Sequence, residues 1–292
     1  MKIRRSFMDR TADVFIYTVL VFICLLTVYP MIYVASMSLS GPEAILKQEV
    51  WLFPIGFSLD SYRMIFETPL FWTSYLNTLW YTIIGTLINL LVTIPAAFVL
   101  SSNTFFARKF FMIMFTFTMF FTGTLIPVFI QVNKLGLYDT RWAIVLPVAV
   151  NTWNLIIART FFKTTIPGAI LESAKMDGAN DITILLKVVL PISKALIAVL
   201  TIFYAVAHWN SWFTATLYLT RNELHPLQLY LRRILLTVQS AFIEPDMSLN
   251  MIAVLQQIKF SSIVVATLPI LFVYPFFQKY FVQGVMLGSI KE

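Results

Sequence analysis

Charge is scarce in this sequence, and so are the residue types on which most enzymes rely. Charged residues make up 12% of the 292 positions, and the chain has two histidines and one cysteine. Soluble domains carry about 25% charged residues. A chain with so little charge and with 59% hydrophobic residues has too few polar groups to cover a surface that faces water, so we expect a lipid bilayer to surround it.

Several absences exclude common catalytic classes. None of the nine glycines is followed by lysine, so the phosphate-binding loop Gly-x4-Gly-Lys-Ser/Thr is missing. His208 and His225 are far apart, and no group of Cys, His or carboxylate residues has the spacing of metal ligands. No Gly-x-Ser-x-Gly element is present, and the single Cys24 cannot form an intrachain disulfide. We predict no catalytic residue, no metal site and no cofactor bound by this chain.

Six apolar runs are long enough, or nearly so, to cross a bilayer. A transmembrane helix needs about 20 mainly apolar residues, whereas barrel strands are about 10 residues of alternating pattern. We therefore predict an all-α, polytopic transmembrane bundle with six spans. The predicted spans are Val14–Ala35, Leu76–Leu100, Phe110–Phe129, Trp142–Ile157, Ala195–Leu219 and Ile263–Phe281. The first run is longer than the core of a signal peptide, so we expect a retained helix.

The distribution of lysine and arginine predicts the orientation. With the N-terminus inside, the inner segments hold most of the 21 Lys and Arg residues although they are shorter in total. This pattern favours a cytoplasmic position for both termini, and it puts the long segments Ser38–Tyr75 and Thr220–Lys259 outside. The net charge of +7 is then a topology signal, and we predict no binding of nucleic acid.

The inner segment 159–194, between the fourth and fifth spans, carries turn signals inside a charged stretch. It predicts two short helices that meet at a sharp corner, because glycine readily adopts the positive φ of a helix stop. The signals, in chain order, are a cap at Thr164 or Thr165, a start at Pro167, a stop at Gly178, a second cap at Asn180 or Asp181 and an end at Pro191. On these signals alone, an ordinary interfacial amphipathic turn remains an equal alternative to a docking element.

This segment resembles the cytoplasmic coupling loop of bacterial ABC importer permeases of type I. The family pattern is Glu-Ala-Ala, three residues, Gly, nine residues and Ile-x-Leu-Pro. Here Val188 stands for Ile and Ser173 for the first Ala, and Asp177-Gly178-Ala179 matches a common core. The resemblance implies contact with an ATPase through Glu172, Ser173, Ala174, Asp177, Gly178, Ala179, Leu190 and Pro191.

The whole chain looks like the carbohydrate-uptake branch of this family, of the type of the second permease subunit of the maltose importer. The run Leu268-Pro269-Ile270 and the segment 277–285 carry this likeness, and the segment 226–233 is similar to a sub-branch linked to oligosaccharides, including uronate-containing ones. The resemblance implies one permease domain over residues 1–292 in the bacterial inner membrane. It also implies a second permease, two ATP-binding cassette subunits that hold ATP and Mg, an extracytoplasmic solute-binding protein and an oligosaccharide substrate.

Polar and aromatic residues inside the spans are candidates for the substrate pathway. Aromatic faces suit the C–H surfaces of sugars, and amides suit their hydroxyls. The candidates are Asn89, Asn151, Trp153, Asn154, His208, Trp209, Asn210 and Trp212. Within this set, His208 and Trp212 are predicted to share a helical face. The alternative is an interfacial aromatic belt with interhelical hydrogen bonds, to which we assign Trp80 and Tyr81.

Other transport classes remain open at this point. An ion-coupled secondary carrier usually needs an intramembrane carboxylate or broken helices at the midplane. All 14 acidic residues fall outside the predicted spans or at their edges, which weighs against proton coupling but leaves sodium coupling open. An ABC permease for a non-sugar solute, or a membrane scaffold that transports nothing, are further alternatives.

Overall fold

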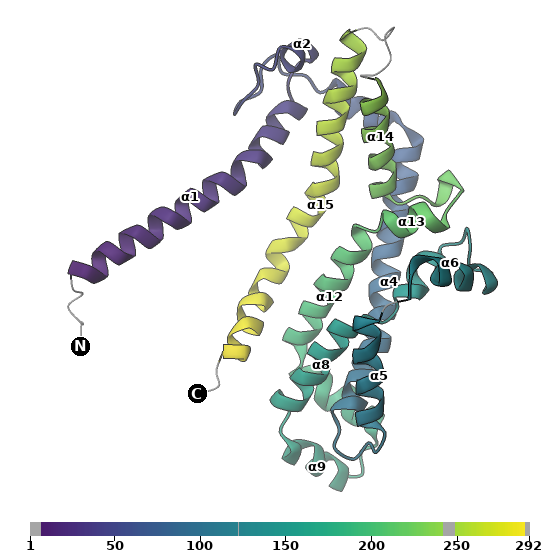
Figure 1. Cartoon of the computed structure of the whole chain (residues 1–292). Coiled ribbons are helices and arrows are strands. Elements are labelled where there is room, and N and C mark those ends of the chain that lie inside the picture. The colour runs from purple at the N-terminus through teal and green to yellow at the C-terminus, as the bar shows by residue number, and fades with distance from the viewer. Residues whose placement is uncertain (1–6, 122, 242–248, 290–292) are drawn as a thin grey trace. The chain divides into compact units, whose positions relative to one another are not determined.

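The computed structural model describes residues 7–121, 123–241 and 249–289, and these residues form helices and connecting segments without a strand (Figure 1). In chain order the elements are α1 (Phe7–Ser38), α2 (Pro42–Leu46), α3 (Asp60–Glu67), α4 (Pro69–Ser101), α5 (Arg108–Phe120), α6 (Leu125–Lys134), α7 (Trp142–Val145), η1 (Leu146–Val148), α8 (Thr152–Thr165), α9 (Gly168–Met176), α10 (Asp181–Ile184), η2 (Leu185–Val189), α11 (Leu190–Ile192), α12 (Lys194–Trp209), α13 (Phe213–Tyr218), η3 (Asn222–Leu224), α14 (Leu227–Ala241) and α15 (Leu249–Ser289). The all-α prediction is confirmed.

Three helical segments are long and apolar enough to cross a membrane as single pieces. They lie in α1, α4 and α15 and cover Thr11–Ser38, Pro69–Ser101 and Met251–Val273. Three bent pairs of helices pass the same test when each pair counts as one span, which brings the number to six. The helices are therefore those of a multi-pass membrane protein, and their number allows the six predicted spans.

The boundaries of three predicted spans are wrong. The third run divides into α5 and α6, since Gly123 lies between them and Pro127 stands in the first turn of α6, where a missing N–H is tolerated. The fourth divides between Val148 and Thr152, so that α7 with η1 meets α8 at an angle of 48°. The fifth ends early, because α12 stops at Trp209 and α13 begins only at Phe213.

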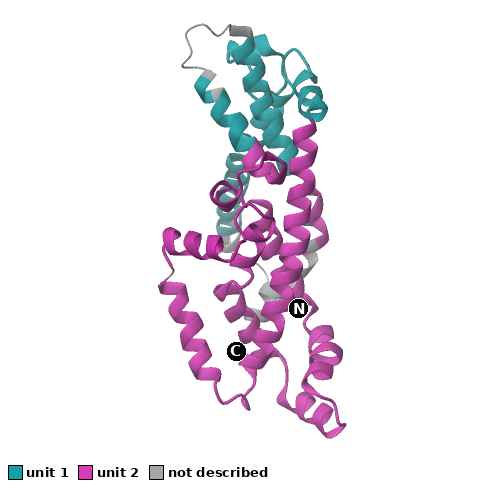
Figure 2. Ribbon diagram, turned by 90° about the vertical axis from the view of Figure 1, so that its right-hand side faces the viewer, with its two compact units in different colours: residues 1–68, 231–268 teal, residues 69–230, 269–292 magenta. Residues whose placement is uncertain are grey.

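The helices fall into two compact units (Figure 2). Unit 1 comprises residues 1–68 and 231–268, and unit 2 comprises residues 69–230 and 269–292. The two units interleave in sequence, so neither is a continuous piece of chain. A single permease domain over residues 1–292 stays a prediction.

Unit 2 is built around α4, which packs against α8 and α12. Its core contains Ala97, Leu155, Ala158 and Leu200, and each of these side chains is fully buried or nearly so. The hydroxyl groups of Thr93 and Tyr204 lie 2.7 Å apart inside this core. Small residues and paired hydroxyls let α4 approach its neighbours closely, as in other membrane bundles.

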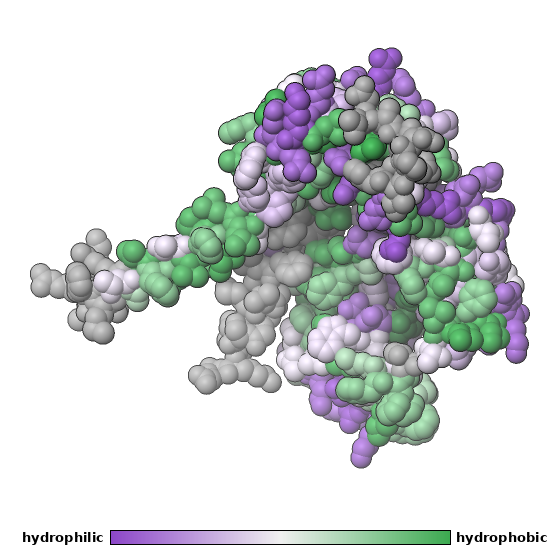
Figure 3. All heavy atoms as spheres, turned by 45° about the horizontal axis from the view of Figure 1, so that its top comes forward, coloured by the Kyte–Doolittle hydropathy of each residue, from purple (hydrophilic) through white to green (hydrophobic). Residues whose placement is uncertain are grey.

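Apolar side chains also cover much of the outer surface (Figure 3). In α1 none of the 18 residues of its most apolar window is buried inside the structure. In water such a helix would expose far more apolar area than a monomeric soluble protein tolerates. In a bilayer the same surface faces lipid or other subunits, as the low charge content predicts.

Candidate coupling and transport site

The corner at Gly178 is a Schellman turn that ends α9. The backbone N–H of Gly178 donates to the carbonyl of Lys175 at 3.0 Å, and the N–H of Ala179 donates to that of Ala174 at 3.0 Å. Gly178 has a φ of +82°, which only glycine adopts without strain. The predicted stop at Gly178 therefore has the expected backbone geometry.

The helix after the corner begins as the sequence predicts, but the helix before it does not. The side-chain oxygen of Asn180 accepts from the N–H of Thr183 at 2.8 Å, so Asn180 is the cap of α10. The predicted cap at Thr164 or Thr165 is wrong, because α8 continues through Thr165 and the Thr164 hydroxyl donates to the carbonyl of Thr160 within that helix. Helix α9 begins after Pro167, whose φ of −64° suits a helix entrance.

We predicted that the second helix ends at Pro191, but it ends one residue later. The helical path continues through Ile192, breaks at Ser193 and resumes in α12 at an angle of 87°. Because Pro191 has no N–H, the carbonyl one turn earlier lacks its usual partner, and a π turn at Leu185–Val189 accommodates the mismatch. Leu190 is half-buried and Pro191 is exposed at this bend.

The segment around the corner has a packed face and an exposed face. Ala174 and Ala179 pack against the core of unit 2 together with Val188 and Leu190. The exposed face carries Glu172, Ser173 and Asp177, and two apolar side chains that the sequence prediction missed. These are Met176, which is 89% exposed, and Ile182, which is 70% exposed. In the sequence, each of these apolar residues stands next to a charged residue in a connecting segment, and this pattern could have identified them.

A buried polar joint links three helical elements of unit 2. The amide oxygen of Asn89 on α4 lies 2.7 Å from Nε2 of His208 on α12. The amide nitrogen of Asn89 donates to the carbonyls of Val148 and Ala149 at 2.7 and 2.9 Å. Those carbonyls lie at the break between η1 and α8, where the helical pattern no longer supplies donors. Asn89 thus satisfies the polar groups that the broken fourth span exposes.

Gly85 makes room for this joint. A Cβ atom at Gly85 would overlap the imidazole ring of His208. The helix α4 therefore needs glycine one turn before Asn89 so that the His208 ring can lie against its backbone. The pair is fully enclosed, since His208 is 3% exposed and Asn89 is 0% exposed.

The remaining pathway candidates make contacts of their own. Asn151 caps α8 by accepting from the N–H of Asn154 at 3.1 Å. Trp209 is buried with its ring 6.2 Å from that of Tyr75, and Trp153 is 57% exposed. Asn210 lies beyond the end of α12, and its amide donates to the carbonyl of Val206.

The predicted shared face of His208 and Trp212 is wrong. The helix ends between them, at Asn210, whose carbonyl accepts from the N–H of Trp212 at 2.9 Å. An i,i+4 relation requires a continuous helix. His208 faces α4 inside the bundle, whereas the Trp212 ring pairs with Phe213 at 5.5 Å.

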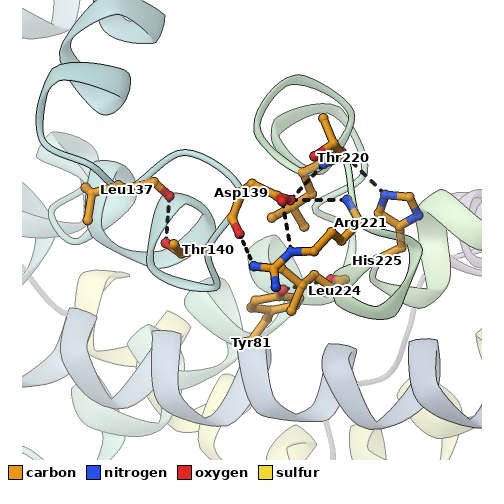
Figure 4. A network of polar contacts seen from close by, with 9 residues as sticks. Tyr81, Leu137, Asp139, Thr140, Thr220, Arg221, Leu224 and His225 are labelled. Carbon is orange, nitrogen blue, oxygen red and sulfur yellow. Dashed lines mark hydrogen bonds and ion pairs between the residues drawn. The ribbon is translucent and has the colours of Figure 1, made fainter.

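A second polar network of unit 2 is centred on Asp139, and no pattern in the sequence predicted it (Figure 4). One carboxylate oxygen of Asp139 accepts from the N–H groups of Thr220 and Arg221, and the other accepts from Nε of Arg221 at 2.8 Å. Burial raises the pKa of Asp139, but these hydrogen bonds outweigh it, and the net pKa lies below the ordinary value. The network joins the α6–α7 connection to the segment after α13.

Tyr81 lies in the first half of α4 and is buried. Its assignment to an interfacial aromatic belt is therefore wrong. Its exposure is 0%, and its hydroxyl donates to the carbonyl of Leu224 at 2.8 Å (Figure 4). Asn77 donates to the carbonyls of Glu223 and His225 from the same helix. Sequence spacing alone could not distinguish a ring facing lipid from one facing the protein.

The described part of the chain also bears on metal binding. No group of three His, Cys, Asp or Glu residues within residues 7–121, 123–241 and 249–289 could hold a metal ion. The cluster around Asn89 consists of an amide, an imidazole and backbone carbonyls, and the network at Asp139 adds one carboxylate and one guanidinium group. Such groups can position helices and recognise hydroxyl-rich ligands.

Known proteins resemble this chain over nearly its whole length. It is 42% identical over 286 residues to the polygalacturonan/rhamnogalacturonan transport system permease protein YtcP of Bacillus subtilis (strain 168). This alignment covers 97% of this chain and 99% of YtcP. It is 38% identical over 266 residues to protein LplC of the same strain, covering 91% of the chain and 90% of LplC. A crystal structure of a bacterial ABC transporter involved in the import of the acidic polysaccharide alginate superimposes with a TM-score of 0.85 at 34% identity, covering 96% of this chain and 100% of that one. No family model matches the chain.

Proposed function

Because this chain belongs to the permease subunits of ABC sugar importers, we propose that it forms half of a membrane pathway that carries an oligosaccharide into the bacterial cytoplasm. The other half is a second permease subunit. Two ATP-binding cassette subunits hold ATP and Mg, and an extracytoplasmic solute-binding protein delivers the substrate. This chain itself binds no cofactor and catalyses no reaction.

The observation that carries the coupling role is the elbow at Gly178. A Schellman turn fixes its backbone, and Ala174 and Ala179 anchor it to the core of unit 2. Met176 and Ile182 project outward from the same elbow. An apolar pair on a rigid, otherwise polar segment suits docking into a groove of another protein, since buried apolar side chains stabilise such contacts. We assign this groove to the ATP-binding cassette subunit.

Motion of the elbow would reach the bundle through α12. The helical path from Asp181 to Ile192 meets α12 at Ser193. Helix α12 is 16 residues long, and His208 lies near its other end, inside the bundle. His208 bonds to Asn89, and Asn89 holds the break in the fourth span. Closure of the ATPase subunits would shift the elbow as a rigid body and tilt this connected set between two arrangements.

We assign an acidic oligosaccharide, rich in uronates, as the substrate. The support is that YtcP is named for polygalacturonan and rhamnogalacturonan and that the structurally similar transporter imports alginate. Asn151 caps α8 at the break in the fourth span, and Trp153 and Asn154 lie in the first turn of α8. They supply amides and an indole ring, which suit sugars. The complex lies in the bacterial cytoplasmic membrane with both termini of this chain inside.

The decisive experiment is uptake by proteoliposomes that contain the copurified complex and its binding protein. We expect uptake of oligogalacturonate that depends on internal ATP and persists without an ion gradient. Neutral oligosaccharides of equal length serve as the comparison. Uptake driven by a sodium or proton gradient without ATP would instead support a secondary carrier and overturn the proposal.

The orientation is tested on the same complex with single cysteines. Cys24 is first replaced by serine, and a cysteine is introduced at Ala174 or at Leu135. We expect a membrane-impermeant maleimide to label position 135 from outside intact cells and position 174 only in inverted vesicles. The reverse labelling pattern would place the elbow outside and exclude its contact with an ATPase.

A further inference from the structure

Unit 1 contains a cavity of about 430 Å³, whereas the candidate pathway residues all belong to unit 2. It lies where the last turns of α1 meet the connection after α2 and the first turns of α15. The residues that shape its chemistry are Tyr29, Tyr33, Gln48, Trp51, Gln256 and Lys259. The cavity thus combines aromatic rings, two amides and one cation.

The walls of this cavity are held in place by specific contacts. The Ser36 hydroxyl donates to the carbonyl of Leu52 at 2.6 Å, which ties the segment carrying Trp51 to α1. The rings of Tyr33 and Phe260 meet edge to face at 6.1 Å, which joins α1 to α15. Met37, Ile45 and Val50 form a small buried cluster beneath. The cavity is therefore built into unit 1 by packed side chains.

Its charge is positive and has no acidic counterpart in the lining. Lys259 lies over the ring of Phe260, with its ammonium group 5.5 Å from the ring centroid. None of the residues that line the cavity is Asp or Glu. A cation held among aromatic rings and amides attracts an anion that can also accept or donate hydrogen bonds.

Gln48 brings an amide to the cavity from a fixed turn at the end of α2. It has a φ of +55° at the end of α2, where its N–H donates to the carbonyl of Ile45 and the N–H of Glu49 donates to that of Ala44. This is the position of a Schellman turn that glycine occupies without strain. A glutamine in this left-handed conformation is less favourable than glycine, and the two hydrogen bonds of the turn hold its backbone in place. Its side chain is part of the cavity lining.

The surroundings decide which anion fits. Tyr29 belongs to the apolar run of the first span, and the neighbouring α1 side chains Leu25, Leu26 and Val28 are between 46% and 66% exposed. A polar cavity that opens beside such a surface matches a ligand with an anionic head and apolar chains. A soluble sugar acid has no chains to cover this part of α1.

We infer that the cavity binds the headgroup of an anionic phospholipid at the membrane–water boundary. The phosphate pairs with Lys259, the amides of Gln48 and Gln256 bond to the headgroup hydroxyls, and the acyl chains lie along α1. Tyrosine and tryptophan are enriched at both membrane–water boundaries, and lysine side chains near helix ends extend toward them. This site goes beyond the proposed function, since lipid binding by unit 1 requires neither transport nor ATP hydrolysis.

The test measures lipid binding to the purified complex. Short-chain phosphatidylglycerol and phosphatidylcholine are each titrated while the thermal midpoint and native mass spectrum are recorded. We expect saturable stabilisation by phosphatidylglycerol that exceeds the effect of phosphatidylcholine. Lys259→Gln should weaken phosphatidylglycerol binding about tenfold, the effect of losing one hydrogen bond to a charged group. Lys47 is next to Gln48 at the end of α2 but is not part of the cavity lining, so Lys47→Gln should leave binding unchanged.

Gln48→Gly separates loss of binding from loss of folding. Glycine relieves the strained φ, so the lipid-free complex should be at least as stable as the wild type, while its affinity for phosphatidylglycerol falls. Equal binding of both lipids, or unchanged binding in Lys259→Gln, would overturn the inference. A third arm uses oligogalacturonate without lipid. If it binds with the same dependence on Lys259, the cavity is a sugar subsite and the lipid assignment is wrong.

Discussion

Asn89 and His208 meet inside the bundle, where the amide oxygen of Asn89 and Nε2 of His208 are 2.7 Å apart and both side chains are closed off from solvent. The residues are 119 positions apart in sequence. Because Asn89 also holds the carbonyls of Val148 and Ala149, this one contact connects α4, α12 and the break in the fourth span. The joint lets these three elements shift together.

The energetic link between Asn89 and His208 can be measured with a double-mutant cycle. Asn89→Ala, His208→Ala and the double variant are compared by thermal unfolding of the purified complex. We expect a coupling energy of about 0.6 kcal/mol and no more than about 1.7 kcal/mol, the range for hydrogen bonds between membrane helices. Additive effects of the two substitutions would show that the contact contributes nothing to stability.

Gly85→Ala tests the close approach of His208 to α4. The added methyl group would overlap the imidazole, and the shifts that such overpacking forces on side chains and backbone cost about 1–3 kcal/mol of stability. The thermal midpoint of the complex should fall. Gly168→Ala is the matched control, since no atom lies within 4 Å of a Cβ built there. His208→Ala in the Gly85→Ala background should remove the clash, and failure to recover part of the lost stability would contradict this explanation.

Gly178 should tolerate asparagine better than alanine or tryptophan. Asparagine adopts positive φ more readily than other L residues, and no neighbouring atom crowds this position. We expect Gly178→Trp to assemble but to lose ATP-dependent uptake, while Gly178→Asn keeps most of it. ATP hydrolysis and sugar uptake are measured on the same preparation. Wild-type uptake in Gly178→Trp would show that the elbow does not act as a lever.

Met176 and Ile182 should contribute to ATPase docking. Burying a methionine or isoleucine side chain gains about 1.5–3 kcal/mol, so Met176→Ser should weaken retention of the ATPase subunits about tenfold or more during purification. The control is Leu135→Ser, which changes a residue that is 61% exposed on the connection after α6. Equal retention in both variants would mean that the apolar side chains of the elbow do not face the ATPase.

The Asp139 network predicts a dependence of stability on acid pH. The pKa of Asp139 in the folded chain lies below the ordinary value of 3.8, so its contribution is present above pH 3.8 and disappears as pH falls below that value. We expect Asp139→Asn to be less stable than wild type at pH 7 by under about 1 kcal/mol, because Arg221 is largely exposed. The thermal midpoints of the two proteins should converge in acid. A constant difference down to the lowest pH at which the complex stays folded would assign the effect to hydrogen-bond geometry rather than charge.

Composition and local pattern determined the class of this protein and much of its local chemistry. The low charge and six apolar runs predicted a membrane bundle because lipid excludes unpaired backbone and charged groups. Gly178 and Asn180 were recognised as stop and cap because each acts on backbone groups only a few residues away. Local rules of this kind can be read from a sequence without knowing the fold.

Only the tertiary structure decided which polar groups meet. Asn89 and His208, Asp139 and Arg221, and Tyr81 and Leu224 are each far apart in sequence, and no periodicity relates them. Their pairing depends on the breaks at residues 149–151, at Ser193 and at 210–212, after which α8, α12 and α13 begin. A small change of helix direction moves a side chain from lipid to protein, so the position of each polar group is a property of the packed bundle.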